Sequence, residues 1–170
     1  MEIKSLVESL LFVADEPVDV ERLAAAIGVE RGAVEGALRE LSGEYEQRGL
    51  RLQHKGGRVQ IVTAPDAAPY IERFLGLELT NRLSAPSLET LAIVAYQQPI
   101  TRAGVEAVRG VNCDSVLRTL VSKGLIEEVG RLPQAGRPIV YGTTFEFLQY
   151  FGLQDLAELP PLAEREQDES

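Results

Sequence analysis

One histidine and one cysteine are the side chains in this sequence best suited to nucleophilic or acid–base chemistry. A serine–histidine–aspartate or cysteine–histidine arrangement would have to be built around His54, the only histidine. His54 alternates in phase with Leu50 and Leu52, which favours a structural role on a short strand. Cys113 lies next to the predicted start of a helix, where a thiolate is stabilised, but no second cysteine can resolve it. The sequence therefore predicts no catalytic site.

Arg131 and Arg137 are candidates for binding a phosphate or a carboxylate. They lie in a segment rich in glycine and proline, residues 130–138, with no acidic side chain between them. A solvated or internally paired arginine is an equally good interpretation. The sequence has no histidine–cysteine cluster, no regularly spaced carboxylate loop and no glycine-rich phosphate motif. We expect neither a metal nor a cofactor.

The charge is unevenly distributed along the chain. The formal net charge is −9. Residues 1–79 hold nine basic and fourteen acidic side chains, whereas residues 80–154 hold seven basic and six acidic ones. Because an acidic protein repels the phosphate backbone, we expect direct DNA binding to be weak or absent.

The expected location is cytoplasmic. The N-terminus lacks the basic start and unbroken apolar core of a signal peptide, and a single cysteine cannot form an internal disulfide. Charged or polar residues interrupt every apolar run before it reaches the roughly 18 residues of a membrane-spanning helix. We expect no part of the chain to cross a membrane.

The chain repeats itself at an offset of 82 residues. Pro17 corresponds to Pro99 and Gly28 corresponds to Gly110, and apolar residues around them keep the same register. Two copies of one domain are the simplest explanation. The predicted parts are an N-terminal domain at 1–79, a C-terminal domain at 80–158 and an acidic tail at 159–170, disordered from Ala163.

The first copy has the pattern of three helices followed by a β-hairpin. A helix starting at Ile3 should end before Pro17, and Asp19 should cap a short second helix that Gly28 stops. A third helix and a hairpin turning at Gly56-Gly57 follow. This pattern predicts a winged helix, completed by a helix near residues 70–75. The third helix should bury Val34, Leu38, Leu41 and Tyr45 before it ends at Gly49.

The second copy repeats this order with a longer wing. Ser84 and Thr101 are the expected helix caps, strands are expected at 125–129 and 139–141, and the wing loop covers 130–138. The fold class is therefore mainly α with small β-hairpins (α+β), in two tandem winged-helix domains. The first helix should bury Leu88, Leu91, Ala92, Ala95 and Tyr96, and the third Leu117, Leu120 and Val121.

The outward faces of both third helices are chemically mixed. Winged helices most often contact DNA with this helix, through side chains that read base edges. Neither helix carries a cluster of such side chains, and Asp114 lies where a phosphate would approach. The outward residues are Arg31, Glu35, Arg39 and Glu40 in the first copy and Asp114, Ser115, Arg118 and Ser122 in the second.

Several motifs resemble the bacterial segregation and condensation protein B family, known as ScpB. The strongest is residues 88–102, Leu-Glu-Thr-Leu-Ala-Ile-Val-Ala-Tyr-Gln-Gln-Pro-Ile-Thr-Arg. Residues 136–138, Gly-Arg-Pro, and residues 141–144, Tyr-Gly-Thr-Thr, add to it. The first domain matches more loosely through residues 8–13 and Glu16-Pro17. The resemblance runs from about residue 3 to residue 162.

The resemblance implies a non-enzymatic subunit of a chromosome-organising complex. Members form a homodimer, associate with the nucleoid and bind the kleisin ScpA, which links the heads of an SMC ATPase in chromosome condensation and partition during cell division. The alternative function is a winged-helix DNA-binding transcriptional regulator. Tyr96, Arg131, Arg137 and Tyr141 are the candidate partner-binding residues, because aromatic and arginine side chains anchor interfaces. For Tyr96 and Tyr141, a place in the core is at least as good an interpretation.

Overall fold

The computed structural model describes residues 1–76 and 82–162. Its contacts form two compact units, one of residues 1–62 with residues 153–162, and one that lies within residues 63–152. The domain boundaries drawn from the sequence stay a prediction, and the expected disorder from Ala163 falls outside the described residues. Within the described ranges, no helix is long and apolar enough to cross a membrane.

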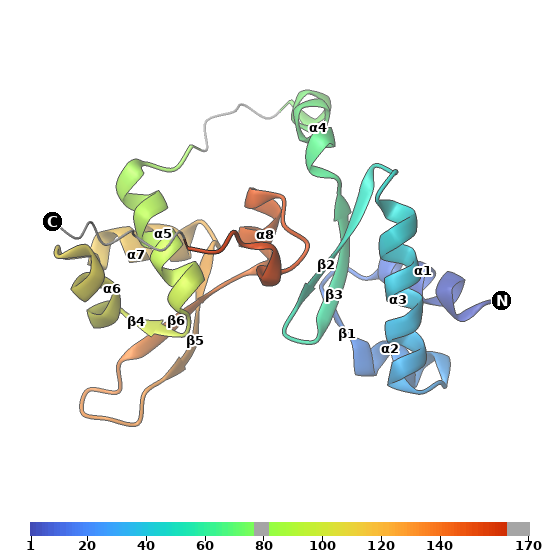
Figure 1. Cartoon of the computed structure of the whole chain (residues 1–170), viewed down its shortest axis with the longest axis horizontal. Helices are drawn as coiled ribbons and strands as arrows, with labels where there is room; N and C mark the ends of the chain where they lie inside the picture. The colour runs from blue at the N-terminus through green and yellow to red at the C-terminus, as the bar shows by residue number, and fades with distance from the viewer. Residues whose placement is uncertain (77–81, 163–170) are drawn as a thin grey trace, which may run out of the picture. The chain divides into compact units, whose positions relative to one another are not determined.

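The first unit is a winged helix. Three helices lie beside a three-stranded antiparallel sheet of order β1-β3-β2, in which β2 and β3 form the wing (Figure 1). Gly56 and Gly57 make the wing turn with φ angles of 57° and 75°, which glycine adopts at little cost. The elements are α1 (Ile3–Val13), β1 (Val18–Asp19), α2 (Val20–Ile27), α3 (Arg31–Tyr45), β2 (Leu50–Lys55) and β3 (Arg58–Thr63).

The core of the first unit lies between α3 and the two preceding helices. The four residues expected to point inward from α3 are all buried, the largest being Tyr45. The Tyr45 hydroxyl donates a hydrogen bond of 2.6 Å to Glu8 Oε1 of α1, so the buried phenol keeps a partner. Asp19 stands at the N-cap of α2, but its side chain accepts no capping hydrogen bond.

The second unit repeats the same architecture. Its sheet has the order β4-β6-β5, and α6 occupies the positions of α2 moved by 82 residues. The predicted fold class and the tandem winged helices are confirmed. The elements are η1 (Pro65–Ala67), α4 (Ala68–Leu75), α5 (Ala85–Gln97), β4 (Ile100–Thr101), α6 (Arg102–Arg109), α7 (Asp114–Ser122), β5 (Ile126–Arg131), β6 (Ile139–Thr143) and α8 (Phe145–Phe151).

The buried face of α5 differs from the predicted one. Leu88 and Tyr96 are 41% and 37% exposed, whereas the polar residues Ser87 and Thr90 are buried. Both polar side chains have partners, because Ser84 Oγ donates to Ser87 Oγ and Arg109 Nη1 donates to Thr90 Oγ1 at 2.8 Å. These hydrogen bonds offset the cost of burying hydroxyl groups. Leu91 and Ala95 of the predicted face are buried as expected, and the prediction was wrong at Leu88, Ala92 and Tyr96.

The segment after α8 returns to the wing of the first unit. The backbone N–H of His54 in β2 donates to Gln154 O at 2.7 Å, and Gln53 Nε2 donates to Leu153 O at 2.8 Å. β2 is the outer strand of its sheet, so this segment covers a strand edge that would otherwise expose unpaired backbone groups. Asp155 follows directly and lies near the imidazole of His54.

Protonation of His54 should destabilise the first unit. Burial lowers the pKa of the imidazole from its ordinary value of 6.5, and Asp155 opposes the shift only in part. The unfolded chain therefore binds a proton at His54 more readily than the folded chain does. The stabilisation from His54 is fully present above pH 6.5 and is lost as the pH falls below it. Urea unfolding at about pH 7.5 and about pH 5.5 should show this loss, and His54→Gln should reduce it. An equal loss of stability in His54→Gln would contradict the role given to His54.

Candidate functional site

A surface depression lined by chemistry-bearing side chains lies in the second unit, between α7, the start of α6 and the wing strands. It has a volume of about 780 Å³, and we call it the α7–wing hollow. Four arginines and two acidic residues line it: Arg102, Asp114, Arg118, Glu128, Arg131 and Arg137. The balance of these charged groups is positive, although the whole chain is acidic.

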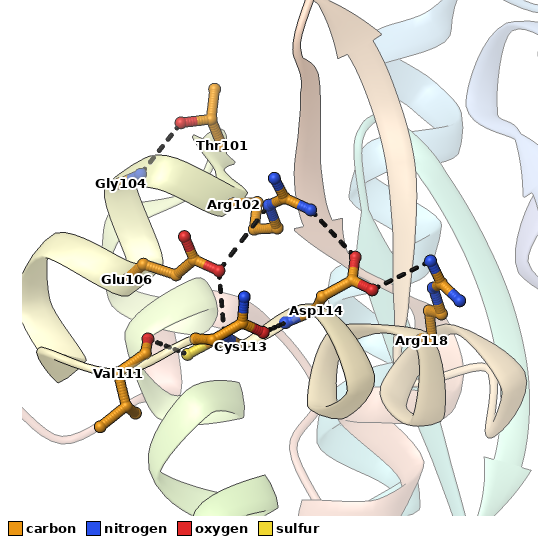
Figure 2. A network of polar contacts seen from close by, with 9 residues as sticks. Thr101, Arg102, Gly104, Glu106, Val111, Cys113, Asp114 and Arg118 are labelled. Carbon is orange, nitrogen blue, oxygen red and sulfur yellow. Dashed lines mark hydrogen bonds and ion pairs between the residues drawn. The ribbon is translucent and has the colours of Figure 1, made fainter.

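On the helical side of the hollow, Asp114 bridges two arginines. Its Oδ1 accepts from Arg102 Nη1 at 3.1 Å, and its Oδ2 lies 2.9 Å from Arg118 Nη2 (Figure 2). Arg102 also lies 3.7 Å from Glu106 Oε1, which accepts from the backbone N–H of Cys113 (Figure 2). The acidic residue in the first turn of α7 therefore holds the two guanidinium groups together and lowers the charge available to a phosphate.

On the wing side, the backbone positions both arginines. Arg131 Nε donates to Glu128 Oε1 at 3.0 Å, and Arg131 Nη1 donates to Arg137 O at 3.3 Å. The backbone N–H of Arg137 donates to Gln134 O, closing a tight turn. Arg137 has a φ of 39°, in the left-handed region that non-glycine residues rarely adopt. Arg131 at the end of β5 and Arg137 in the wing loop thus present guanidinium groups to the same hollow.

Apolar side chains line the rest of the hollow. Val121 was expected to be buried by α7 but is 43% exposed and lies in this lining. Ile139 and Tyr141 contribute from β6, and Pro138 precedes that strand. The surface therefore combines arginines with exposed apolar area, as protein-binding sites often do.

Three of the four candidate partner-binding residues come together here. Arg131, Arg137 and Tyr141 line the α7–wing hollow, and Tyr141 is partly buried there. Tyr96 lies near the end of α5, outside the lining. Sequence reasoning did not select Arg102 or Arg118 for this site. The register of the repeat could have indicated them, because Arg102 is the first residue of α6, the helix that faces the start of α7.

The first unit has a smaller counterpart, the α3–wing hollow, of about 480 Å³. Arg31, Arg39, Lys55 and Arg58 line it together with the acidic residues Glu35, Glu46 and Asp155. Asp155 reaches it from the segment that covers β2. The two hollows occupy equivalent places in the repeat, but the second has the larger excess of arginine over acid.

Neither Cys113 nor His54 belongs to a catalytic arrangement in the described part of the chain. Cys113 is fully buried, and its Sγ donates to Val111 O at 3.4 Å (Figure 2). His54 is partly buried beside Asp155. Within residues 1–76 and 82–162, no group of three or more histidine, cysteine, aspartate or glutamate residues is placed to hold a metal ion.

The two units and their hollows define a tandem winged-helix protein with a mixed arginine and apolar surface on its second helix–wing face. Residues 5–162 match the model of the family described as segregation and condensation complex subunit ScpB. The chain belongs to this family. Membership gives no support to the alternative of a transcriptional regulator.

Relatives named segregation and condensation protein B match most of the chain, and two solved ScpB structures match 89% and 42% of it. The segregation and condensation protein B of Moorella thermoacetica is 51% identical over 94% of this chain and 83% of its own length. The protein of the same name from Desulforamulus reducens is 50% identical over 95% of this chain and 90% of its own length. The crystal structure of ScpB from Mycobacterium tuberculosis is 42% identical, covers 89% of this chain and 96% of that chain, and has a TM-score of 0.43. A crystal structure of a dimer of the ScpB N-terminal domain complexed with ScpA peptide is 31% identical in sequence. The match covers 42% of this chain and 91% of that chain, with a TM-score of 0.40.

Proposed function

We propose that this protein is a non-enzymatic accessory subunit of an SMC–kleisin complex, acting in chromosome condensation and partition. It binds the kleisin ScpA as a homodimer in the cytoplasm and associates with the nucleoid through the complex. The family match over residues 5–162 carries this proposal. The α7–wing hollow supports it, because its arginines and apolar groups suit a protein partner better than a small substrate.

Arg131, Arg137 and Tyr141 are the proposed partner contacts in the second unit. They share one hollow although they are spread over a wing loop and two strands. Arginine and tyrosine contribute much of the binding energy in many interfaces, since both combine polar groups with large contact area. Tyr96 is proposed as a separate contact, because this residue is 37% exposed near the end of α5.

The homodimer is proposed to form through α1 of the first unit. Phe12 and Val13 at the end of this helix are 83% and 69% exposed. A hollow of about 430 Å³ lies on the same unit, where Leu10, Val13 and Val18 line it together with the charged residues Asp15, Glu16 and Arg22. A two-fold dimer places identical patches against each other, so an exposed aromatic ring near a partly apolar hollow suits this arrangement.

Phe12→Glu should convert the dimer to a monomer. A carboxylate in an apolar interface loses its hydration without a partner, and we expect dimer dissociation to become about 100-fold more favourable. Light scattering coupled to size exclusion measures the mass over a concentration series. Phe74→Glu is the matched control, because Phe74 is 87% exposed on α4 and the charge change is the same. A dimer that survives Phe12→Glu would move the interface away from α1.

Co-purification with the kleisin encoded in the same genome tests the proposed function itself. The two proteins are co-expressed with a tag on the kleisin, and the mass of the recovered complex gives its stoichiometry. We expect a complex containing two copies of this chain. A chain that is monomeric at all concentrations and is not retained by the kleisin would overturn the proposal.

A further inference from the structure

We infer that the α7–wing hollow binds a partner segment in which a carboxylate side chain lies beside a large apolar side chain, with Arg137 as the residue that contacts the carboxylate. The inference rests on the proposed function for the identity of the partner, the kleisin. The chemistry of the segment follows from the hollow itself.

The backbone of Arg137 is the first observation. Among the described residues, it is the one non-glycine residue with a positive φ. Glycine adopts this conformation with less strain, and Gly136 just before it does so at 79°. An arginine at such a position lowers the stability of the fold relative to glycine. The backbone conformation therefore gives no reason for an arginine here. Residues held in this region often serve a binding site, which points to a role for the side chain.

The pattern of ion pairs is the second observation. Arg102 and Arg118 are paired with Asp114, and Arg131 is paired with Glu128. Between described residues, no ion pair engages the guanidinium group of Arg137. Three arginines of the hollow therefore have partners within the protein. The guanidinium group of Arg137 can form a charge-assisted, bidentate contact with an incoming carboxylate.

The apolar lining decides between a protein segment and DNA. Val121, Ile139 and Tyr141 would contact an apolar side chain next to the carboxylate. A DNA backbone would offer phosphates at regular spacing, and it would bring them towards Asp114 and Glu128, which repel them. The charge and the apolar area together fit an acidic, apolar peptide segment.

Calorimetric titration of the full chain with the purified kleisin tests this inference. Arg137→Gly removes the guanidinium group and leaves a residue suited to the backbone conformation. We expect it to bind the kleisin about tenfold more weakly than the natural chain, while its thermal unfolding midpoint stays equal or rises. Arg39→Ala, which removes the same charge from the α3–wing hollow, should bind like the natural chain.

Salt and duplex DNA separate the possible results. The affinity difference between the natural chain and Arg137→Gly should shrink from about 50 mM to about 500 mM salt, since a carboxylate contact is screened. An unchanged affinity for Arg137→Gly, with the natural chain still binding, would overturn this inference alone. Failure of the natural chain to bind the kleisin would overturn the proposed function and this inference with it. Tight binding of a DNA duplex of about 30 base pairs that is lost in Arg137→Gly would overturn the inference, because the hollow would then bind DNA and not a peptide.

Discussion

Replacing Leu120 with alanine is expected to lower the free energy of unfolding of the second unit by about 2–5 kcal/mol. Leu120 is fully buried on α7, where it belongs to the core of the second unit. Alanine removes buried methyl groups and leaves a cavity that the surrounding helices and sheet can fill only in part. Hydrogen exchange followed by mass spectrometry on peptides from α5 and α7 measures the change in this unit.

Val121→Ala is the control for this experiment. Val121 is the next residue on the same helix and is 43% exposed, so its replacement should change the unfolding free energy by about 0.5 kcal/mol or less. Equal effects of Leu120→Ala and Val121→Ala would mean that α7 is rotated from the orientation described. Urea unfolding of the first unit should be unaffected by either change.

Replacing Gln98 with alanine is expected to destabilise the second unit by about 2–3 kcal/mol. Gln98 Oε1 accepts from the backbone N–H of Thr143 at 2.9 Å and from its hydroxyl at 3.1 Å. Gln98 Nε2 donates to Ala95 O at 3.0 Å. Thr143 is fully buried, so alanine at position 98 leaves two of its donors without this acceptor. Gly142 keeps the site open, because a Cβ there would lie 3.1 Å from Gln98 Oε1.

Gln97→Ala provides the matched comparison for Gln98. Gln97 is the preceding residue and is exposed, so the same substitution there should cost about 0.5 kcal/mol or less. Gln98→Glu keeps an acceptor for Thr143 and should recover part of the loss. The protection of β6 amides against hydrogen exchange reports on this contact directly. Unchanged protection in Gln98→Ala would show that Thr143 has another acceptor.

The sequence predicted the repeat and the winged helices well because both rest on local patterns. The offset of 82 residues relates α2 to α6, and Gly28 and Gly110 end these helices with φ angles of 80° and 72°. The face of α5 was predicted less well, since Thr90 is buried through a hydrogen bond from Arg109, nineteen positions away. Apolar periodicity contains no information about such a partner. The same limit applies to Val121, which extends the apolar pattern of α7 but lies at the surface.

The order of helices and strands in this protein was determined by the sequence alone, through periodicity, capping residues and glycine turns. These signals act between residues a few positions apart. The α7–wing hollow was decided only by the tertiary structure, because Arg102, Arg118 and Tyr141 meet through the packing of two helices against the wing. The distinction between Arg137 and the paired arginines also depends on that packing. Ion pairing and backbone conformation are set by neighbours that the linear sequence does not reveal.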